Sequence, residues 1–237
     1  MKARFLLTAL CVFLSACSVS RDAQLRKAVT FECGDYTSSD VRRLLKAGAD
    51  VNSRGEDGRT ALLNAYRIGC GVFEYEPEHE DAVKSLRLLL AHGADIRAVT
   101  PQGHNALDLA LSYHDNEPLV AVLREQGLRA SNPEYEMVWH AMHNHAADVR
   151  RLLAAGVSPN AHSVRGESAL WATMPHINVK SHSSECMELL LAAGADVHEK
   201  EDDRTILDAA RIFAGEEMEV RYLKLLQQHG AVYSREE

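Results

Sequence analysis

The sequence predicts an all-α solenoid of about six helix-turn-helix repeats joined by short hairpin loops. A phrase of the type Leu-Leu-x-x-Gly-Ala recurs in variants along the chain, and its glycine stands at positions 48, 93, 127, 156, 194 and 230. Successive glycines are 29 to 45 residues apart, a spacing typical of arrays of two-helix units. Aromatic residues make up only 6% of the 237 residues, whereas Ala and Leu, which favour helices, are abundant.

A second phrase precedes the first in most repeats. It reads GRTALLNA at 58–65, HNALDLA at 104–110, ESALWAT at 167–173 and DRTILDAA at 203–210. These segments resemble the T-P-L-H-x-A motif of ankyrin repeats, although none of them keeps both the Pro and the His. The resemblance covers residues 22–234 and implies an ankyrin-repeat domain with repeats at about 22–56, 57–101, 102–132, 133–164, 165–201 and 202–234.

Each repeat is expected to begin and end at defined residues. The first helix should start at a Thr or Ser, and the second should run into a Gly that takes the left-handed conformation. One helix pair cannot bury its own apolar face, so stacking of the pairs must create the core. Relative to the resembled pattern, the turn between the paired helices is lengthened in repeats 1, 2, 5 and 6. The longest insertion, around 71–80, predicts a Pro-containing acidic surface loop.

The N-terminus has the layout of an export signal. Lys2 and Arg4 precede an apolar run from Phe5 to Leu14, which is shorter than the ~20 residues of a membrane span. Leu14-Ser15-Ala16-Cys17 resembles the lipobox of bacterial lipoproteins. The resemblance implies a signal peptide over 1–16, lipidation of Cys17 and a short tether over 17–21. Because Ser18 and not Asp follows, it also implies a periplasmic protein anchored to the outer membrane.

Charge and motifs narrow the classes of function. The formal charge of −8 becomes −10 once Lys2 and Arg4 leave with the signal, so phosphate backbones should repel the mature chain. The sequence contains no Gly-rich phosphate loop, no GxSxG elbow and no HExxH helix. We therefore expect no enzyme activity, no cofactor and no nucleic-acid partner.

Histidines and cysteines leave alternatives open. His140, His143 and His145 lie close together in the sequence, and imidazoles at i, i+3 could share a transition metal. Exposed imidazoles on helical turns are the commoner explanation, and no metal site is assigned. Cys33 and Cys70 stand at equivalent places in adjacent repeats. They could form a disulfide, although stacked helices lie ~8–10 Å apart and a disulfide requires Cα atoms within ~7 Å. Cys186 is expected to be a buried thiol.

Partner-binding residues come from two arguments. Exposed aromatic residues among charges are typical of recognition surfaces. The inserted loop has this character, and its predicted contact residues are Phe73, Glu74, Tyr75, Glu76 and Glu78. Ankyrin repeats as a family bind proteins through hairpin tips and the exposed side of the first helix. The resemblance therefore implies contacts at Glu56, Asp57, Arg59, Arg67, Gln102, His104, Tyr113, Tyr135, His143, Asn144, Arg165, Glu167, His176, Asp202, Arg204 and Phe213. The alternative for any of these residues is a solvated face or packing against the next repeat.

Three functional hypotheses follow. The first is an immunity or inhibitor protein that neutralises a secreted antibacterial toxin, such as a lipase-type effector. It rests on the predicted lipid anchor, the acidic charge and the lack of catalytic motifs, together with analogy at the level of the family. The second is a periplasmic scaffold in envelope maintenance or oxidative-stress defence. The third is a His-based metal-binding protein.

Overall fold

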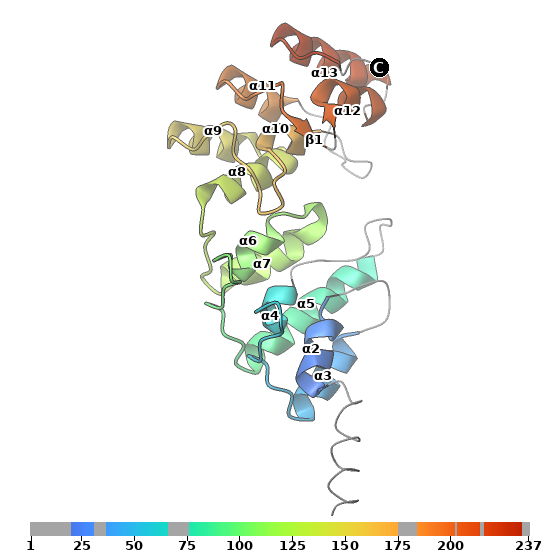
Figure 1. Ribbon diagram of the computed structural model, residues 1–237, viewed down its shortest axis with the longest axis vertical. Helices are drawn as coiled ribbons and strands as arrows, with labels where there is room; N and C mark the ends of the chain where they lie inside the picture. Colours follow the sequence, from blue (N-terminus) through green and yellow to red (C-terminus); the bar gives the residue numbers. More distant parts are fainter. Residues whose placement is uncertain are drawn as a thin grey trace, which may run out of the picture.

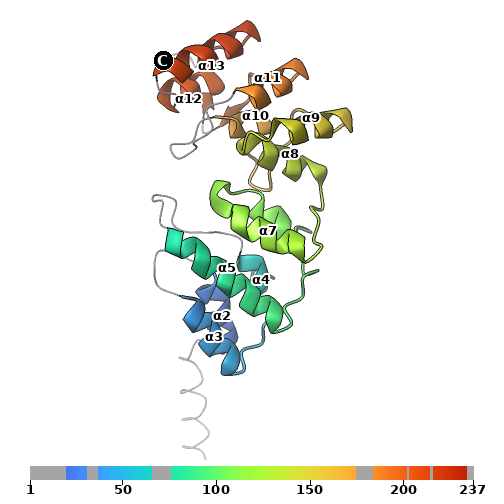
Figure 2. The same ribbon diagram turned by 180° about the vertical axis from the view of Figure 1, so that it is seen from behind.

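The computed structural model describes residues 20–30, 37–65, 76–174, 184–201, 203–213 and 216–233. These residues form six stacked pairs of helices, with the first and last pairs at opposite ends of the long axis (Figures 1 and 2). The predicted all-α solenoid is confirmed. The N-terminal three pairs are α2 (Arg21–Ala28) with α3 (Ser38–Lys46), α4 (Ala61–Asn64) with α5 (Glu76–Ala91), and α6 (Ala106–Ala110) with α7 (Glu117–Glu125).

The C-terminal half repeats the arrangement of the N-terminal half. In the N-terminal half a 3-10 turn, η1 (His114–Asn116), lies between α6 and α7. A two-stranded hairpin of β1 (Lys200–Glu201) and β2 (Arg204–Thr205) precedes the last pair. The helix pairs of this half are α8 (Pro133–Met142) with α9 (Ala146–Ala154), α10 (Ala169–Ala172) with α11 (Glu185–Ala192), and α12 (Ile206–Phe213) with α13 (Glu216–Gln228).

Short polar side chains begin the first helices, as the sequence predicts. The Thr60 hydroxyl accepts a hydrogen bond from the backbone N–H of Leu63, and Ser168 accepts one from Trp171, both at 3.3 Å. Such caps satisfy backbone donors that the helix itself leaves unpaired and each contributes about 1 kcal/mol. They fix where each first helix starts, and therefore where the hairpin before it ends.

Glycine ends the second helices. The six recurring glycines have φ between 78° and 91°, a conformation that costs other residues free energy. At Gly48 the reversal lets the N–H of Ala49 donate to the carbonyl of Leu44 at 3.1 Å. This bond closes the C-terminal end of α3, and the chain then turns toward the next hairpin.

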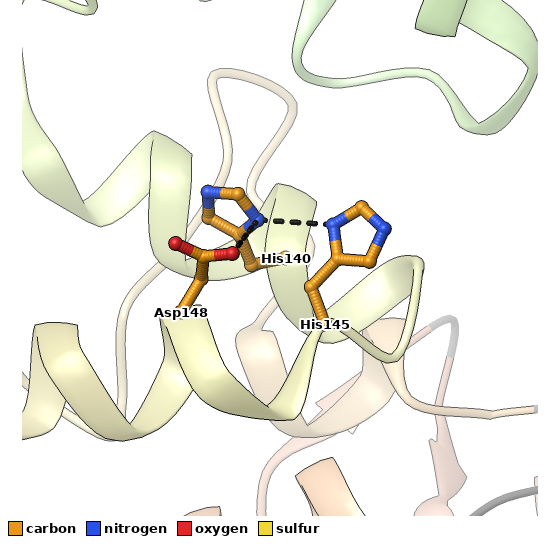
Figure 3. Close-up of side chains that lie close together, drawn as sticks. All are labelled: His140, His145 and Asp148. Atoms are coloured by element: carbon orange, nitrogen blue, oxygen red, sulfur yellow. Dashed lines mark hydrogen bonds and ion pairs between the residues drawn. The ribbon is translucent and has the colours of Figure 1, made fainter.

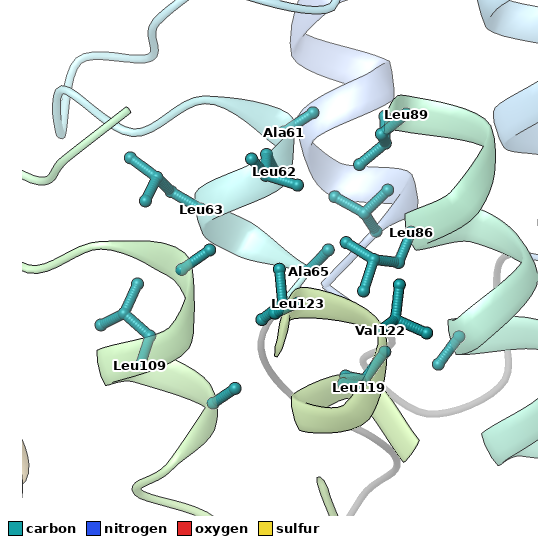
Figure 4. Packing of buried hydrophobic residues seen from close by; sticks show 14 of the residues in the cluster. Ala61, Leu62, Leu63, Ala65, Leu86, Leu89, Leu109, Leu119, Val122 and Leu123 are labelled. Atoms are coloured by element: carbon teal, nitrogen blue, oxygen red, sulfur yellow. The ribbon is translucent and has the colours of Figure 1, made fainter. Parts of the chain in front are cut away.

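The core is divided into two clusters of buried residues. The first runs from Leu25 to Leu123 and also includes Trp139 of α8, and the second runs from Met137 to Ala231. The first cluster contains Leu86 and Leu89 of α5 together with Leu119 and Leu123 of α7 (Figure 4). Each fully buried Leu contributes about 1.5–3 kcal/mol relative to an exposed one. Stacking therefore supplies the stability that no single helix pair has.

Two expectations about inserted segments are corrected. The stretch predicted as a loop up to residue 80 is helical from Glu76, the first residue of α5. Pro77 fits there because the first N–H groups of a helix have no partner within the helix. In repeat 6 the additional residues lengthen the two helices, and only residues 214–215 separate them.

Several predicted features lie outside the described residues: the signal peptide, Cys17, Cys33 and Cys70. Among the residues that are described, we find no helix with both the length and the apolar character that crossing a membrane requires. Cys186 is buried, as expected, and its burial raises the pKa of the thiol to about 12.

Candidate functional site

The hairpin tips share one turn geometry. In the tip at 100–104 the N–H of Thr100 donates to the carbonyl of His104 at 2.9 Å, and the N–H of Gly103 donates to the carbonyl of Thr100 at 2.9 Å. The same two bonds occur in the tip at 163–167, and the tip at 55–59 is closed in the same way. These backbone bonds leave side chains at the tips exposed to solvent, namely those of Glu56, Asp57, Gln102 and Arg165.

His104 and Tyr135 form a pair beside the second of these tips. The Tyr135 hydroxyl oxygen lies 3.4 Å from Nδ1 of His104, and the two rings meet edge to face with centroids 5.8 Å apart. Both side chains are half-buried. Burial, together with the nearby carboxylates of Asp108 and Glu134, raises the pKa of the Tyr135 phenol. The phenol therefore keeps its proton and can act as a hydrogen-bond donor at neutral pH.

Arg165 connects its tip to the third repeat. Its guanidinium carbon lies 4.7 Å from the ring centroid of Tyr113, which is half-buried. Such a cation–π contact contributes about 0.5–1 kcal/mol when it is exposed. It also holds an aromatic ring and a guanidinium together at the surface, and these two groups dominate the energetics of many protein interfaces.

Glu167 is an acidic residue of the same hairpin tip as Arg165. Burial and the neighbouring charge of Glu201 raise the pKa of the Glu167 carboxyl to about 7, while Arg165 and His114 act in the opposite direction. The carboxyl therefore changes its protonation state close to neutral pH. Tyr113, Arg165 and Glu167 together are called the central cluster below.

The structure corrects the expectation for His143. Its side chain is only 6% exposed, and its ring centroid lies 3.8 Å from that of Trp139 and 4.9 Å from that of His114. Nδ1 lies 2.8 Å from the carbonyl oxygen of Trp139, and Nε2 lies 2.8 Å from the carbonyl oxygen of His114. His143 thus packs between repeats 3 and 4, and its neighbours cover it so that a partner cannot contact it.

Asn144 also has a structural role that the sequence did not indicate. Its φ of 52° places it in the left-handed region, which Asn tolerates better than most residues. Its Oδ1 accepts a hydrogen bond from the N–H of Cys186 at 3.4 Å. Asn144 therefore reverses the chain between α8 and α9 and connects repeat 4 to α11.

The other predicted contact residues have simpler placements. Arg204 is exposed on β2, and Arg59 is half-buried at the end of the first tip. The backbones of Glu76, Glu78 and Phe213 are helical, but their side chains are not described. The remaining predicted contact residues lie outside the described residues: Arg67, Phe73, Glu74, Tyr75, His176 and Asp202.

The potential metal ligands that lie together differ from the pair that the sequence spacing indicated. His140, His145 and Asp148 each direct one ligand atom toward the others, and these atoms all lie within 4.8 Å of one another (Figure 3). The i, i+3 spacing had indicated His140 with His143. The backbone turn at Asn144 instead places His145 next to His140. The spacing of the histidines in the sequence could not predict this turn.

Comparisons with known proteins support the repeat pattern locally. No family model matches the chain. Human ankyrin repeat and SOCS box protein 6 is 43% identical over 63 residues, which are 27% of this chain and 14% of that protein. Mouse ankyrin repeat and SOCS box protein 16 is 33% identical over 100 residues, which are 40% of this chain and 19% of that protein. The chain thus matches less than a fifth of the length of these relatives.

Two solved structures are similar over most of the chain. The ankyrin repeat domain of human ASB11 has a TM-score of 0.47 and 22% identity, and the match covers 89% of this chain and 85% of that one. An ankyrin repeat domain from Acinetobacter baumannii has a TM-score of 0.41 and 24% identity, and the match covers 88% of this chain and 98% of that one. The recurring phrases, the stacked helix pairs and the local similarity to ankyrin repeat proteins together identify an ankyrin-repeat solenoid.

Proposed function

We propose that this chain is a lipid-anchored periplasmic protein that binds another protein and neutralises a secreted antibacterial toxin. The ankyrin-repeat solenoid implies protein–protein interaction, which is the general part of the proposal. The observation that carries it is the Tyr113–Arg165 pair, held at the surface next to exposed hairpin tips. Aromatic and guanidinium groups in such a setting are the usual anchors of protein interfaces.

The toxin-neutralising part rests on the sequence. A lipidated Cys17 would hold the solenoid at the membrane where an incoming toxin arrives, and several acyl chains on one residue give stable anchoring. The formal charge of −8, or −10 without the predicted signal, favours a basic partner and speeds its association. The chain also lacks the catalytic motifs searched for above, which fits a protein that acts by occupying a surface of its target.

The binding step is tested by capture and by inhibition. The tagged lipoprotein is purified from the producing strain, and the captured partner is assayed for toxicity with and without added wild-type protein. Tyr113→Ala should lower the affinity for the partner at least tenfold, whereas Tyr113→Phe, which keeps the ring beneath Arg165, should bind nearly as well. Tyr233→Ala is the matched control, because Tyr233 is an exposed aromatic residue near the C-terminus.

The outcomes separate the parts of the proposal. If the Tyr113→Ala variant binds its partner as tightly as the wild type does, the central cluster is not the interface. If the captured partner is not toxic, the immunity role is wrong even though protein binding stands. A catalase or another stress-defence protein as the partner would favour the scaffold hypothesis.

Anchoring is tested separately. Cys17→Ala should leave the solenoid folded and release it from the membrane fraction, because the acyl chains would be lost. Circular dichroism checks the fold, and fractionation followed by immunoblotting locates the protein. Retention of the variant in the membrane fraction after signal removal would refute the lipobox interpretation.

A further inference from the structure

We propose that His140, His145 and Asp148 form a binding site for a divalent transition-metal ion, with Zn²⁺ as the ion that the ligands fit best. Two imidazoles and one carboxylate are a typical ligand set of zinc sites that keep a coordination position open. The site lies where α8 ends and α9 begins (Figure 3). It is independent of the central cluster and of any toxin partner.

The distances between the ligand atoms agree with a shared ion. Nδ1 of His140 lies 3.1 Å from Nδ1 of His145 and 3.8 Å from Oδ2 of Asp148. Two nitrogens bound to one tetrahedral Zn²⁺ at about 2.0–2.1 Å are separated by about 3.3 Å. All three atoms lie within 4.8 Å of one another, so side-chain rotation that closes the longer distances would place them in one coordination sphere.

The backbone holds the ligands in this arrangement. His140 belongs to the last turn of α8, His145 is the N-cap of α9, and Asp148 belongs to the first turn of α9. The left-handed Asn144 reverses the chain between the two histidines. The N–H of His145 then donates to the carbonyl of His140 at 2.8 Å, which fixes the two residues relative to each other.

A neighbouring carboxylate selects the nitrogen of His140 that faces the site. Oε2 of Glu136 lies 3.5 Å from Nε2 of His140, and Glu136 is itself paired with Arg124. Metal-binding histidines usually direct their second N–H toward a carboxylate, which leaves the other nitrogen unprotonated for the ion. In His140 that other nitrogen is Nδ1, the atom that faces His145 and Asp148.

Asp148 presents one oxygen to each neighbour. Its Oδ1 accepts a hydrogen bond from Arg151 at 3.0 Å, and Oδ2 lies toward His140. The hydrogen bond from Arg151 and the nearby charges lower the pKa of the Asp148 carboxyl, although slight burial acts in the opposite direction. The carboxyl is therefore ionised at neutral pH, as a metal ligand must be.

The site is open to solvent on one side. His140 is buried, whereas His145 is exposed and the Asp148 side chain is 41% exposed. An ion can therefore enter from solvent, and a fourth position remains for water. Without a metal the two imidazoles can instead share an N–H···N hydrogen bond, which is the alternative that the experiment must exclude.

Zn²⁺ titration of the purified mature protein by calorimetry tests the proposal. The wild-type protein should bind one equivalent more than the His145→Ala variant binds, or bind that equivalent at least tenfold more tightly. The matched control is His92→Ala, which removes an exposed histidine at the end of α5 and should leave the affinity unchanged. Circular dichroism confirms that each variant is folded.

Two further measurements keep the proposal falsifiable. Saturating Zn²⁺ should raise the thermal midpoint of the wild-type protein more than that of His145→Ala, because a ligand that binds only the folded state stabilises it. Glu136→Gln should weaken binding without abolishing it, because Glu136 positions His140 and does not touch the ion. Equal binding by wild type and His145→Ala, or an equal loss in His92→Ala, would overturn the assignment.

Discussion

Two boundaries between neighbouring repeats are built from different kinds of side chain. Between repeats 2 and 3, Leu86 and Leu123 are at most 1% exposed and lie among other aliphatic side chains (Figure 4). Between repeats 3 and 4, the His143 ring packs between the rings of Trp139 and His114. One helical architecture thus accepts both chemistries. The second boundary contains the imidazole of His143, whose pKa is lowered by burial.

The aliphatic boundary should respond most strongly to truncation. Leu86→Ala removes a side chain that is 0% exposed and should lower the free energy of unfolding by about 3 kcal/mol, since it combines lost burial with a cavity. Urea denaturation followed by circular dichroism measures the loss. Val232→Ala is the control, because Val232 is 59% exposed and should change stability by less than about 0.5 kcal/mol. Equal effects of the two changes would mean that α5 does not support the stack.

The ends of the helices were the part of the fold most readable from sequence. Thr60 and Ser168 accept backbone hydrogen bonds at the starts of α4 and α10, and Gly48 takes a left-handed conformation after α3. Both rules are local, because a cap or a turn depends on residues within one helical turn. The fold class could be predicted for this reason, and the recurrence of the two phrases predicted that the helix pairs stack.

The candidate site was harder to predict because it depends on contacts between repeats. His143 was expected to be exposed, but the carbonyl of His114, 29 residues earlier, lies 2.8 Å from its Nε2. The side chain of Arg165 likewise reaches Tyr113 from a tip that is far away in the sequence. Helical periodicity assigns a residue to a face of its own helix. It does not show which side chain of another repeat covers that face.

The histidine boundary should weaken in acid. Burial lowers the pKa of His143, although its hydrogen bonds to the Trp139 and His114 carbonyls oppose this. The unfolded chain therefore takes up the proton first, and stability is lost as the pH falls below the ordinary value of 6.5. The free energy of unfolding should fall by at most about 1.4 kcal/mol per pH unit from this group.

A comparison of variants isolates this effect from other titrating groups. Urea denaturation between pH 7.5 and 5 should show a shallower pH dependence for His143→Phe, which keeps a ring against Trp139 but cannot bind a proton. His92→Phe, at an exposed histidine, should retain the wild-type dependence. A His143→Phe profile that parallels the wild-type profile would show that the boundary is insensitive to protonation.

Glu167 should have a smaller effect of opposite sign. Its pKa rises from an ordinary value of 4.5 to about 7, mainly through burial. The folded state therefore holds the proton more tightly than the unfolded state, and stability is lost as the pH rises from about 4.5 to 7. Glu167→Gln should stabilise the protein by about 1 kcal/mol at pH 8, after allowance for solvent screening at a half-buried site, and by less at pH 5. Thermal unfolding at the two pH values measures the difference, and no gain at pH 8 would contradict it.

The smallest expected effect is the coupling between Arg165 and Tyr113. Their contact spans repeat 4, because Tyr113 follows α6 and Arg165 lies in the tip before α10. A double-mutant cycle of Arg165→Ala and Tyr113→Ala should give a coupling of about 0.5–1 kcal/mol in the free energy of unfolding. Arg165→Lys should retain part of it, because an ammonium also binds an aromatic face but cannot stack on it. The contact joins the third repeat to the fifth, so its loss should reduce the cooperativity of unfolding between the two halves of the solenoid. A coupling near zero would mean that the guanidinium interacts as favourably with water as with the Tyr113 ring. A partner could then separate the two side chains with little loss of folding stability.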